Sequence, residues 1–113
     1  MPRVLTKSTV PVRVHCLGLA FSPDLQGAIE AEVSKLSGYA KLVDNCELHV
    51  GNWHLHHDAG TQYRVSLEIE LTGGRGELVT SRQSELNAAP EALLQALREA
   101  FAVSLGRLQY AAA

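Results

Sequence analysis

Residues 10–40 decide the fold and read VPVRVHCLGLAFSPDLQGAIEAEVSKLSGYA, because a strand pattern changes into a helix pattern within them. Apolar side chains alternate with polar ones over 10–17, which is typical of a half-buried strand. Ser22-Pro23 then indicates a helix start, since the hydroxyl can accept a hydrogen bond from a free backbone N–H and proline suits the first turn. Apolar residues recur at helical spacing over 25–40, and Gly38 suits a left-handed helix end. The stretch predicts a strand followed by an amphipathic helix.

Further strands and a second helix follow this stretch. Alternating apolar residues predict strands over 45–53, 62–72 and 76–82, and Gly73-Gly74 provides a tight turn before the last of them. A second amphipathic helix is expected from about Ala88 to Tyr110. Its apolar seam would consist of Leu94, Leu97, Phe101, Leu105 and Leu108.

The resulting element order, β-α-β-β-β-α, predicts an α+β two-layer sandwich. Because each strand buries one face, we expect a four-stranded mixed sheet with both helices on one face. A right-handed crossover would make the first two strands parallel and leave the others antiparallel. The chain of 113 residues is expected to form a single domain, with its core at about 10–110.

Composition limits the classes of function. Ten Lys and Arg against 12 Asp and Glu give a net charge of -2, which excludes the basic excess of a typical nucleic-acid binder and leaves room only for a local patch. No apolar run reaches the roughly 18 residues of a membrane span, and the N-terminus lacks the apolar core of a signal peptide. Cys16 and Cys46 alternate with apolar residues and are expected to be reduced core thiols. We therefore expect a cytoplasmic protein without a cofactor.

The densest group of chemically active side chains is His54-Leu55-His56-His57-Asp58, in a polar stretch between two predicted strands. Imidazoles with a carboxylate can bind zinc or another late transition metal, so His54, His56 and His57 are weak metal candidates. Their spacing matches no structural zinc pattern, and a solvated hairpin loop is the favoured interpretation. No Ser–His–Asp or Cys–His context supports nucleophilic catalysis, so we expect a protein that is not an enzyme.

Several short motifs occur in a defined order along residues 10–110. They are Leu17-Gly18-Leu19, Phe21-Ser22-Pro23-x-Leu25, Lys35-Leu36-x-x-Tyr39, Tyr63-Arg64-Val65, Gly73-Gly74 and Leu105-x-Arg107-Leu108. In this order they resemble the ribosome hibernation promoting factor and ribosome-associated inhibitor family, also called sigma-54 modulation proteins. The length of the chain resembles the short form of that family, which lacks the C-terminal domain that pairs ribosomes into dimers.

The resemblance implies a stress-response regulator of translation with no enzymatic activity. Members of the family bind the small ribosomal subunit in the channel of messenger and transfer RNA, with no DNA or membrane partner. Their Lys and Arg side chains, mainly on the two helices and nearby loops, contact ribosomal RNA phosphates. The cations of this chain that we expect to make such contacts are Lys35, Lys41, Arg82, Arg98 and Arg107.

The chain departs from the family in having few basic residues on its helices. Glu32 and Gly38 in the first helix, and Ala100, Val103 and Gly106 in the second, stand where relatives commonly carry a basic side chain. About four or five cations would roughly halve the salt-dependent part of an interaction that uses six to ten phosphate contacts.

This departure leaves an alternative function open, namely a protein-interaction module of the same fold that has lost ribosome binding. Leu93, Ala96, Ala100 and Val103 are expected to extend the apolar stripe of the second helix beyond its core seam. A helix face of small residues suits close packing, so a homodimer through the second helix would be the corresponding assembly.

Overall fold

The computed structural model describes residues 3–5, 10–54, 61–85 and 87–112. The strands are β1 (Arg3–Leu5), β2 (Val12–Leu17), β3 (Val43–His54), β4 (Thr61–Leu71) and β5 (Gly76–Gln83). The helices are α1 (Pro23–Val33), its 3-10 continuation η1 (Ser34–Tyr39), the short 3-10 turn η2 (Thr72–Gly74) and α2 (Glu91–Ala112).

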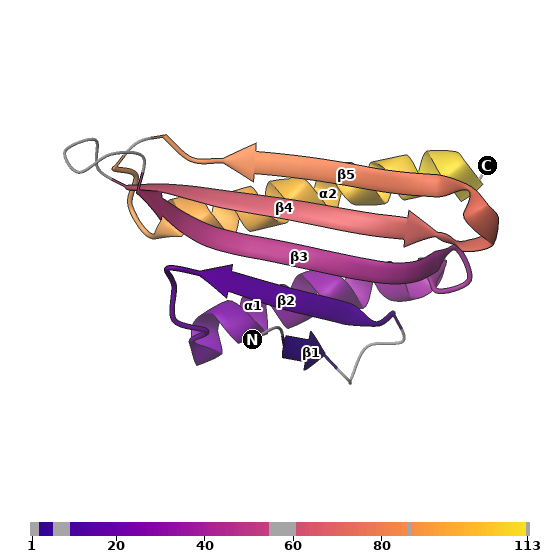
Figure 1. Ribbon diagram of the computed structural model, residues 1–113, viewed down its shortest axis with the longest axis horizontal. Coiled ribbons are helices and arrows are strands. Elements are labelled where there is room, and N and C mark those ends of the chain that lie inside the picture. Colours follow the sequence, from indigo (N-terminus) through magenta and orange to yellow (C-terminus); the bar gives the residue numbers. More distant parts are fainter. Residues whose placement is uncertain (1–2, 6–9, 55–60, 86, 113) are drawn as a thin grey trace.

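The sheet has the spatial order β1-β2-β3-β4-β5, with β2 and β3 parallel and all other neighbours antiparallel. Figure 1 looks onto one face of this sheet, and both helices lie behind it, α1 behind β2 and β3 and α2 behind β4 and β5. The predicted α+β order and the mixed sheet of β2 to β5 are confirmed. The structure adds β1, which pairs with β2 from Arg3↔Val14 to Leu5↔Val12.

The core lies between the sheet and the helices. Alternate residues of β2, β3 and β4 are buried, as the period-two pattern predicts. They pack with apolar side chains of α1, η1 and α2 that recur at helical spacing. The fully buried members include Val12, Cys46, Leu48, Leu67 and Ile69 from the sheet, and Ile29, Leu36, Leu97, Phe101 and Leu108 from the helices.

The first helix begins as expected and ends differently. The Oγ of Ser22 accepts a hydrogen bond from the N–H of Leu25 at 3.1 Å, and Pro23 occupies the first turn. The expected left-handed end at Gly38 is wrong, because the chain tightens into η1 and Gly38 is not among the residues with positive φ. Gly73 and Gly74 do have positive φ, 68° each, as the turn before β5 requires.

The second helix does not expose the apolar stripe that was expected to pack against a partner. Leu93, Ala96 and Ala100 are buried in the core, so they do not form a free face. Val103 is the exposed member of that set, because it lies on the side of α2 that faces away from the sheet. None of the helices in the described ranges combines the length and the apolar character needed to cross a membrane.

Candidate functional site

Two surfaces carry the side chains of functional interest. The first surrounds α1, η1 and α2 and holds most of the cations predicted to contact RNA. The second is the face of the sheet that no helix covers, which we call the open face (Figure 1). Its residues alternate with the buried ones along each strand.

Lys35 is a paired cation. Its Nζ donates to both carboxylate oxygens of Glu32, each at 3.1 Å, one turn earlier on the same helical segment. Glu32, which stands where relatives commonly carry a basic side chain, is only 7% exposed. A buried carboxylate needs a charged or hydrogen-bonding partner, so Lys35 has a structural role and its charge is largely neutralised.

Arg107 connects α2 to β5, the border strand of the sheet. Its Nη1 donates to the carbonyl oxygen of Val79 at 2.7 Å and lies 3.4 Å from Oγ1 of Thr80. Thr80 also accepts a hydrogen bond from the buried hydroxyl of Ser104 at 2.9 Å. The guanidinium has five N–H donors, so the remaining ones stay available to a phosphate. Its orientation, however, is fixed by β5.

Among the five predicted cations, Lys41 and Arg98 are the two whose side chains interact least with the rest of the protein. Neither side chain makes a hydrogen bond or ion pair with any residue in the described ranges. The backbone of Lys41 is held in place, since its carbonyl oxygen accepts from Oγ1 of Thr72 at 3.1 Å. Arg82 interacts with the protein through one hydrogen bond, in which its Nη1 donates to the carbonyl oxygen of Ser81 at 2.7 Å.

The five predicted cations do not form one compact patch. Lys35 and Lys41 lie close in sequence, on η1 and the turn into β3. Arg98 and Arg107 are roughly 14 Å apart along the axis of α2. Arg82 lies at the carboxyl end of β5, at the opposite end of the molecule from the turn before β3 (Figure 1). Ala100, where the family pattern placed a basic residue, is fully buried, so this position of the chain is not on the surface that could contact RNA.

The predicted histidine group falls largely outside the structure described. His54 is the last residue of β3, and its side chain, like all of His56 and His57, lies outside the described residues. Within the ranges that are described, no group of three or more His, Cys, Asp or Glu residues could hold a metal ion. The weak metal candidates therefore remain a prediction.

The cysteines have the chemistry of core residues. Both are free thiols, and the strand register separates them, with Cys16 opposite Val50 and Cys46 opposite Val12. Burial, with a smaller contribution from the charge of Glu47, raises the pKa of Cys46 from 9.0 to about 12. A thiol that is protonated at neutral pH is a poor nucleophile and metal ligand. Both cysteines are free thiols as expected, but only Cys46 is fully buried in the core, whereas Cys16 is half-buried.

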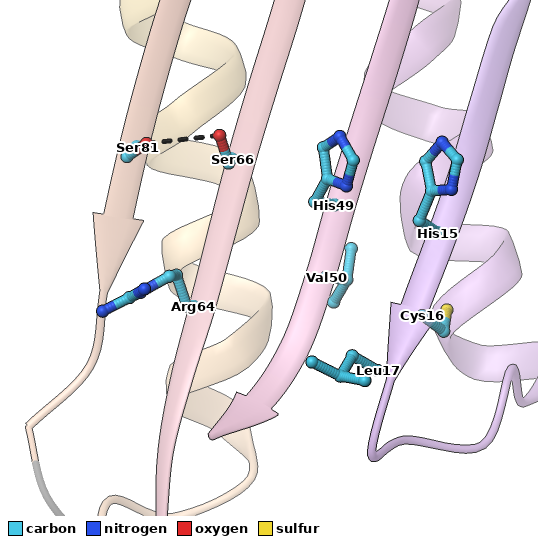
Figure 2. Close-up of a pocket in the computed structure, with 8 residues that line it drawn as sticks. All are labelled: His15, Cys16, Leu17, His49, Val50, Arg64, Ser66 and Ser81. Atoms are coloured by element: carbon cyan, nitrogen blue, oxygen red, sulfur yellow. Dashed lines mark hydrogen bonds between the residues drawn. The ribbon is translucent and has the colours of Figure 1, made fainter. Parts of the chain in front are cut away.

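The open face contains an arrangement that the sequence did not reveal. His15 and His49 stand opposite each other on β2 and β3, with ring centroids 4.5 Å apart and planes inclined by 9°. Nε2 of His15 is 3.0 Å from Glu47, and Nε2 of His49 is 3.0 Å from Glu68. An ionised carboxylate only accepts, so each Nε2 carries the proton of its hydrogen bond. The parallel rings are visible in Figure 2.

Comparison with known proteins places the fold. No protein-family model and no curated protein matches the sequence. Solved structures do match. A ribosomal subunit interface protein from Coxiella burnetii superposes with a TM-score of 0.61 and 13% identity, over 88% of this chain and 98% of its own. The N-terminal domain of Protein Y from Thermus thermophilus gives a TM-score of 0.58 and 13% identity, over 85% and 93%.

The chain shares their fold. At this identity the likeness concerns the arrangement of strands and helices alone. It agrees with the predicted α+β fold, whose parallel pair β2 and β3 and two helices on one face are seen in the structure itself.

Proposed function

We propose that the chain is a ribosome-associated factor that binds RNA of the small ribosomal subunit and silences or protects idle ribosomes under stress. The observation that carries the proposal is the fold, shared over most of both chains with a protein described as a ribosomal subunit interface protein. The motif order of the sequence supports the same family. The proposed setting is the cytoplasm, and the proposed unit is one domain with its core at about 10–110.

Lys41 and Arg98 are the cations on which the proposed RNA contacts depend most, although the two do not belong to one compact patch. Both are exposed and have no partner among the described residues, so their charges are available to phosphates. Arg107 would contribute its spare donors from a fixed position, and Lys35 and Arg82 would contribute less. Because contacts to phosphate oxygens dominate such surfaces, the chain would recognise the shape and charge of folded RNA more than its base sequence.

The small number of free cations sets the expected strength of binding. Each phosphate neutralised contributes roughly 0.7–0.9 to the slope of log affinity against log salt. With Lys35 neutralised by Glu32, we expect a slope of about −2 to −4, which is shallow for a protein that binds RNA through its backbone. Binding would therefore be weak, and its loss with salt gradual.

Co-sedimentation with ribosomes across a salt series tests the proposal. We expect saturable binding to isolated small subunits at low salt, and loss of binding in the double variant Lys41→Glu/Arg98→Glu. Arg13→Glu is the matched control, because Arg13 is an exposed cation on the open face. No pelleting of the unaltered protein at low salt would contradict the function. Equal loss in the control would contradict the assigned surface.

The alternative, a protein-interaction module, has less support than the sequence indicated. Of the helix face expected to pack against a partner, only Val103 is exposed. Tyr110, 87% exposed near the end of α2, adds a second large side chain to that side. A monomeric mass at high protein concentration would remove the homodimer form of this alternative.

A further inference from the structure

The end of the molecule at which α2 finishes carries an exposed aromatic ring. Ser104 and Leu108 are buried and mark the side of α2 that faces the sheet, whereas Tyr110 lies on the opposite side and is 87% exposed. Gly106, one turn earlier on the same side as Tyr110, has no side chain, and a Cβ placed there would meet nothing within 4 Å. The helix itself therefore leaves the ring of Tyr110 open to a ligand.

Arg107 lies beside this ring and is held in position. Residues three apart on a helix are neighbours on its surface, so the guanidinium of Arg107 is adjacent to Tyr110. Its Nη1 donates to the carbonyl oxygen of Val79 at 2.7 Å, which fixes the guanidinium against β5. The other N–H donors of Arg107 make no hydrogen bond within the described ranges. An open ring thus has a cation of fixed position next to it.

Two further cations reach the same end from turns that lie far apart in the sequence. Thr72 joins these turns, because its Oγ1 donates to the carbonyl oxygen of Lys41 at 3.1 Å and its N–H donates to that of Leu42 at 2.9 Å. Arg75 follows Thr72 at the start of β5, near the end of α2 (Figure 1). Lys41 and Arg75 are exposed, and neither side chain makes a hydrogen bond or ion pair with a described residue. Arg75 is not among the five cations predicted from the sequence.

The charge on the helix side of this end favours an anion. Glu70 and Glu77 also lie here, but they stand opposite each other on the open face, across the sheet from α2. Asp44 is the described carboxylate nearest to Lys41 along the chain, and it opposes an anion. The three cations named above outnumber it. A local basic patch therefore exists, although the net charge of the whole chain is -2.

An aromatic ring among cations is typical of sites for unpaired nucleic acid. A free base can stack on the ring, which strengthens binding about ten-fold or more, while the cations contact the phosphates. The bases of a duplex are stacked on one another and are not available in this way. A stable protein interface buries about 1,200–2,000 Å². Val103 and Tyr110 are the only large apolar side chains exposed on the described part of α2, so a protein partner fits this end less well.

We propose that this end of the molecule binds an unpaired RNA segment, with one base stacked on Tyr110 and the flanking phosphates contacted by Arg107 and Arg75. Lys41 contacts the strand further along. The proposal rests on the proposed function and specifies it, because it states which form of RNA the chain contacts. It adds an aromatic ring and a cation on a glycine-rich turn to the contacts expected from the sequence.

Fluorescence anisotropy with short RNAs tests this site. The full chain is titrated at low salt into a labelled single-stranded dodecamer, the same dodecamer annealed to its complement, and an abasic dodecamer that keeps the sugars and phosphates alone. We expect saturable binding of the single strand. The duplex and the abasic strand should each bind about ten-fold more weakly, because neither presents a free base to Tyr110.

Variants separate stacking from general attraction of anions. Tyr110→Ala should weaken binding of the single strand about ten-fold, and Tyr110→Phe, which keeps the ring, should restore it. Arg75→Gln should make the slope of log affinity against log salt shallower by about 0.7, the value of one phosphate contact to a single strand. Arg13→Gln, which removes an exposed cation of the open face, is the control and should leave the affinity unchanged. These residues are exposed, so we expect the variants to fold.

The outcomes are distinct. Equal affinity for the abasic strand, an unchanged affinity in Tyr110→Ala, or an equal loss in Arg13→Gln would overturn the proposal. Co-sedimentation of the unaltered protein with small subunits separates it from the proposed function. Pelleting without binding of the dodecamer would mean that this site is wrong and the proposed function stands. Binding of the dodecamer through Tyr110 without pelleting would support the site and contradict the proposed function.

Discussion

The helix side and the open face both carry exposed cations, but the two sides use them differently. On the helix side, Lys35 is neutralised by Glu32 and Arg107 is held by the backbone of β5. On the open face, Arg64 donates from Nη2 to the side-chain oxygen of Gln83 at 3.1 Å, a contact between neighbouring strands of the sheet. The difference teaches that exposure of a cation does not measure its availability to a ligand. The partner of each cation decides that.

The largest expected effect comes from the buried side of the sheet, where Cys46 lies. Because the pKa of Cys46 is raised from 9.0 to about 12, the folded protein holds the thiol proton more tightly than the unfolded chain. The stabilisation is complete below pH 9 and is lost as the pH rises toward 12. We expect the free energy of unfolding to fall by up to about 1.4 kcal/mol per pH unit in this window.

Urea unfolding from pH 8 to pH 11 measures this slope. Cys46→Val should remove the part that belongs to the thiol, while Cys16→Ala, at a half-buried thiol on the neighbouring strand, should retain it. The same slope in Cys46→Val and in the unaltered protein would show that other groups cause the alkaline loss.

The next effect tests the contrast between paired and free cations on the helix side. Lys35→Ala leaves the carboxylate of Glu32, 7% exposed, without its partner and should cost about 1–3 kcal/mol. Lys41→Ala removes a lysine with no partner among the described residues and should change stability by less than about 0.5 kcal/mol. Chemical unfolding of both variants gives the comparison, and equal values would remove the distinction.

Two arginines of α2 give a second comparison between a hydrogen-bonded cation and a cation without a described partner, with a smaller expected effect on stability. Arg107→Ala deletes the hydrogen bond to the carbonyl oxygen of Val79 and should cost about 1 kcal/mol. Arg98→Ala, on the same helix, should be close to neutral. For ribosome binding the order should reverse, with the larger loss of pelleting in Arg98→Ala. A uniform loss in both variants would mean that the two arginines are equivalent to RNA.

The smallest expected effect is on the open face. Glu68→Gln weakens one of the two contacts between a carboxylate and a stacked imidazole, and both partners are more than a third exposed. Solvent screening limits such a pair, so the change in unfolding free energy should stay below about 1 kcal/mol. Thermal unfolding at low and high salt measures it. A loss of several kcal/mol would mean that the histidine pair is a main support of the sheet.

The sequence predicted the elements whose periodicity is long enough to recognise. β2 to β5 and the two helices were within a few residues of their predicted bounds, because alternation and helical spacing report directly on burial. β1 was missed, since three residues cannot establish a period of two. The 3-10 end of the first helix was missed as well, because glycine permits a left-handed turn without requiring it.

The candidate site was less accessible to prediction for a different reason. The pairing of Lys35 with Glu32 could have been found, since residues three apart on a helix are neighbours. The contact of Arg107 with Val79 depends on the position of α2 over β5. The stacking of His15 on His49 depends on the register of two parallel strands. Alternation along a strand predicts which face of the sheet a side chain occupies, but it does not predict which residue of the neighbouring strand lies opposite.

The hydrogen bond from Arg107 also has a consequence for the behaviour of the protein at high concentration. β5 borders the sheet, and Val79 on it has a side chain that is 46% exposed. A border strand with unpaired carbonyl groups is a template on which a strand from another molecule can add. By occupying the carbonyl of Val79, the guanidinium denies that position to an incoming N–H. Arg107 thus helps to keep the molecules apart, and light scattering should detect faster aggregation of Arg107→Ala than of Arg98→Ala.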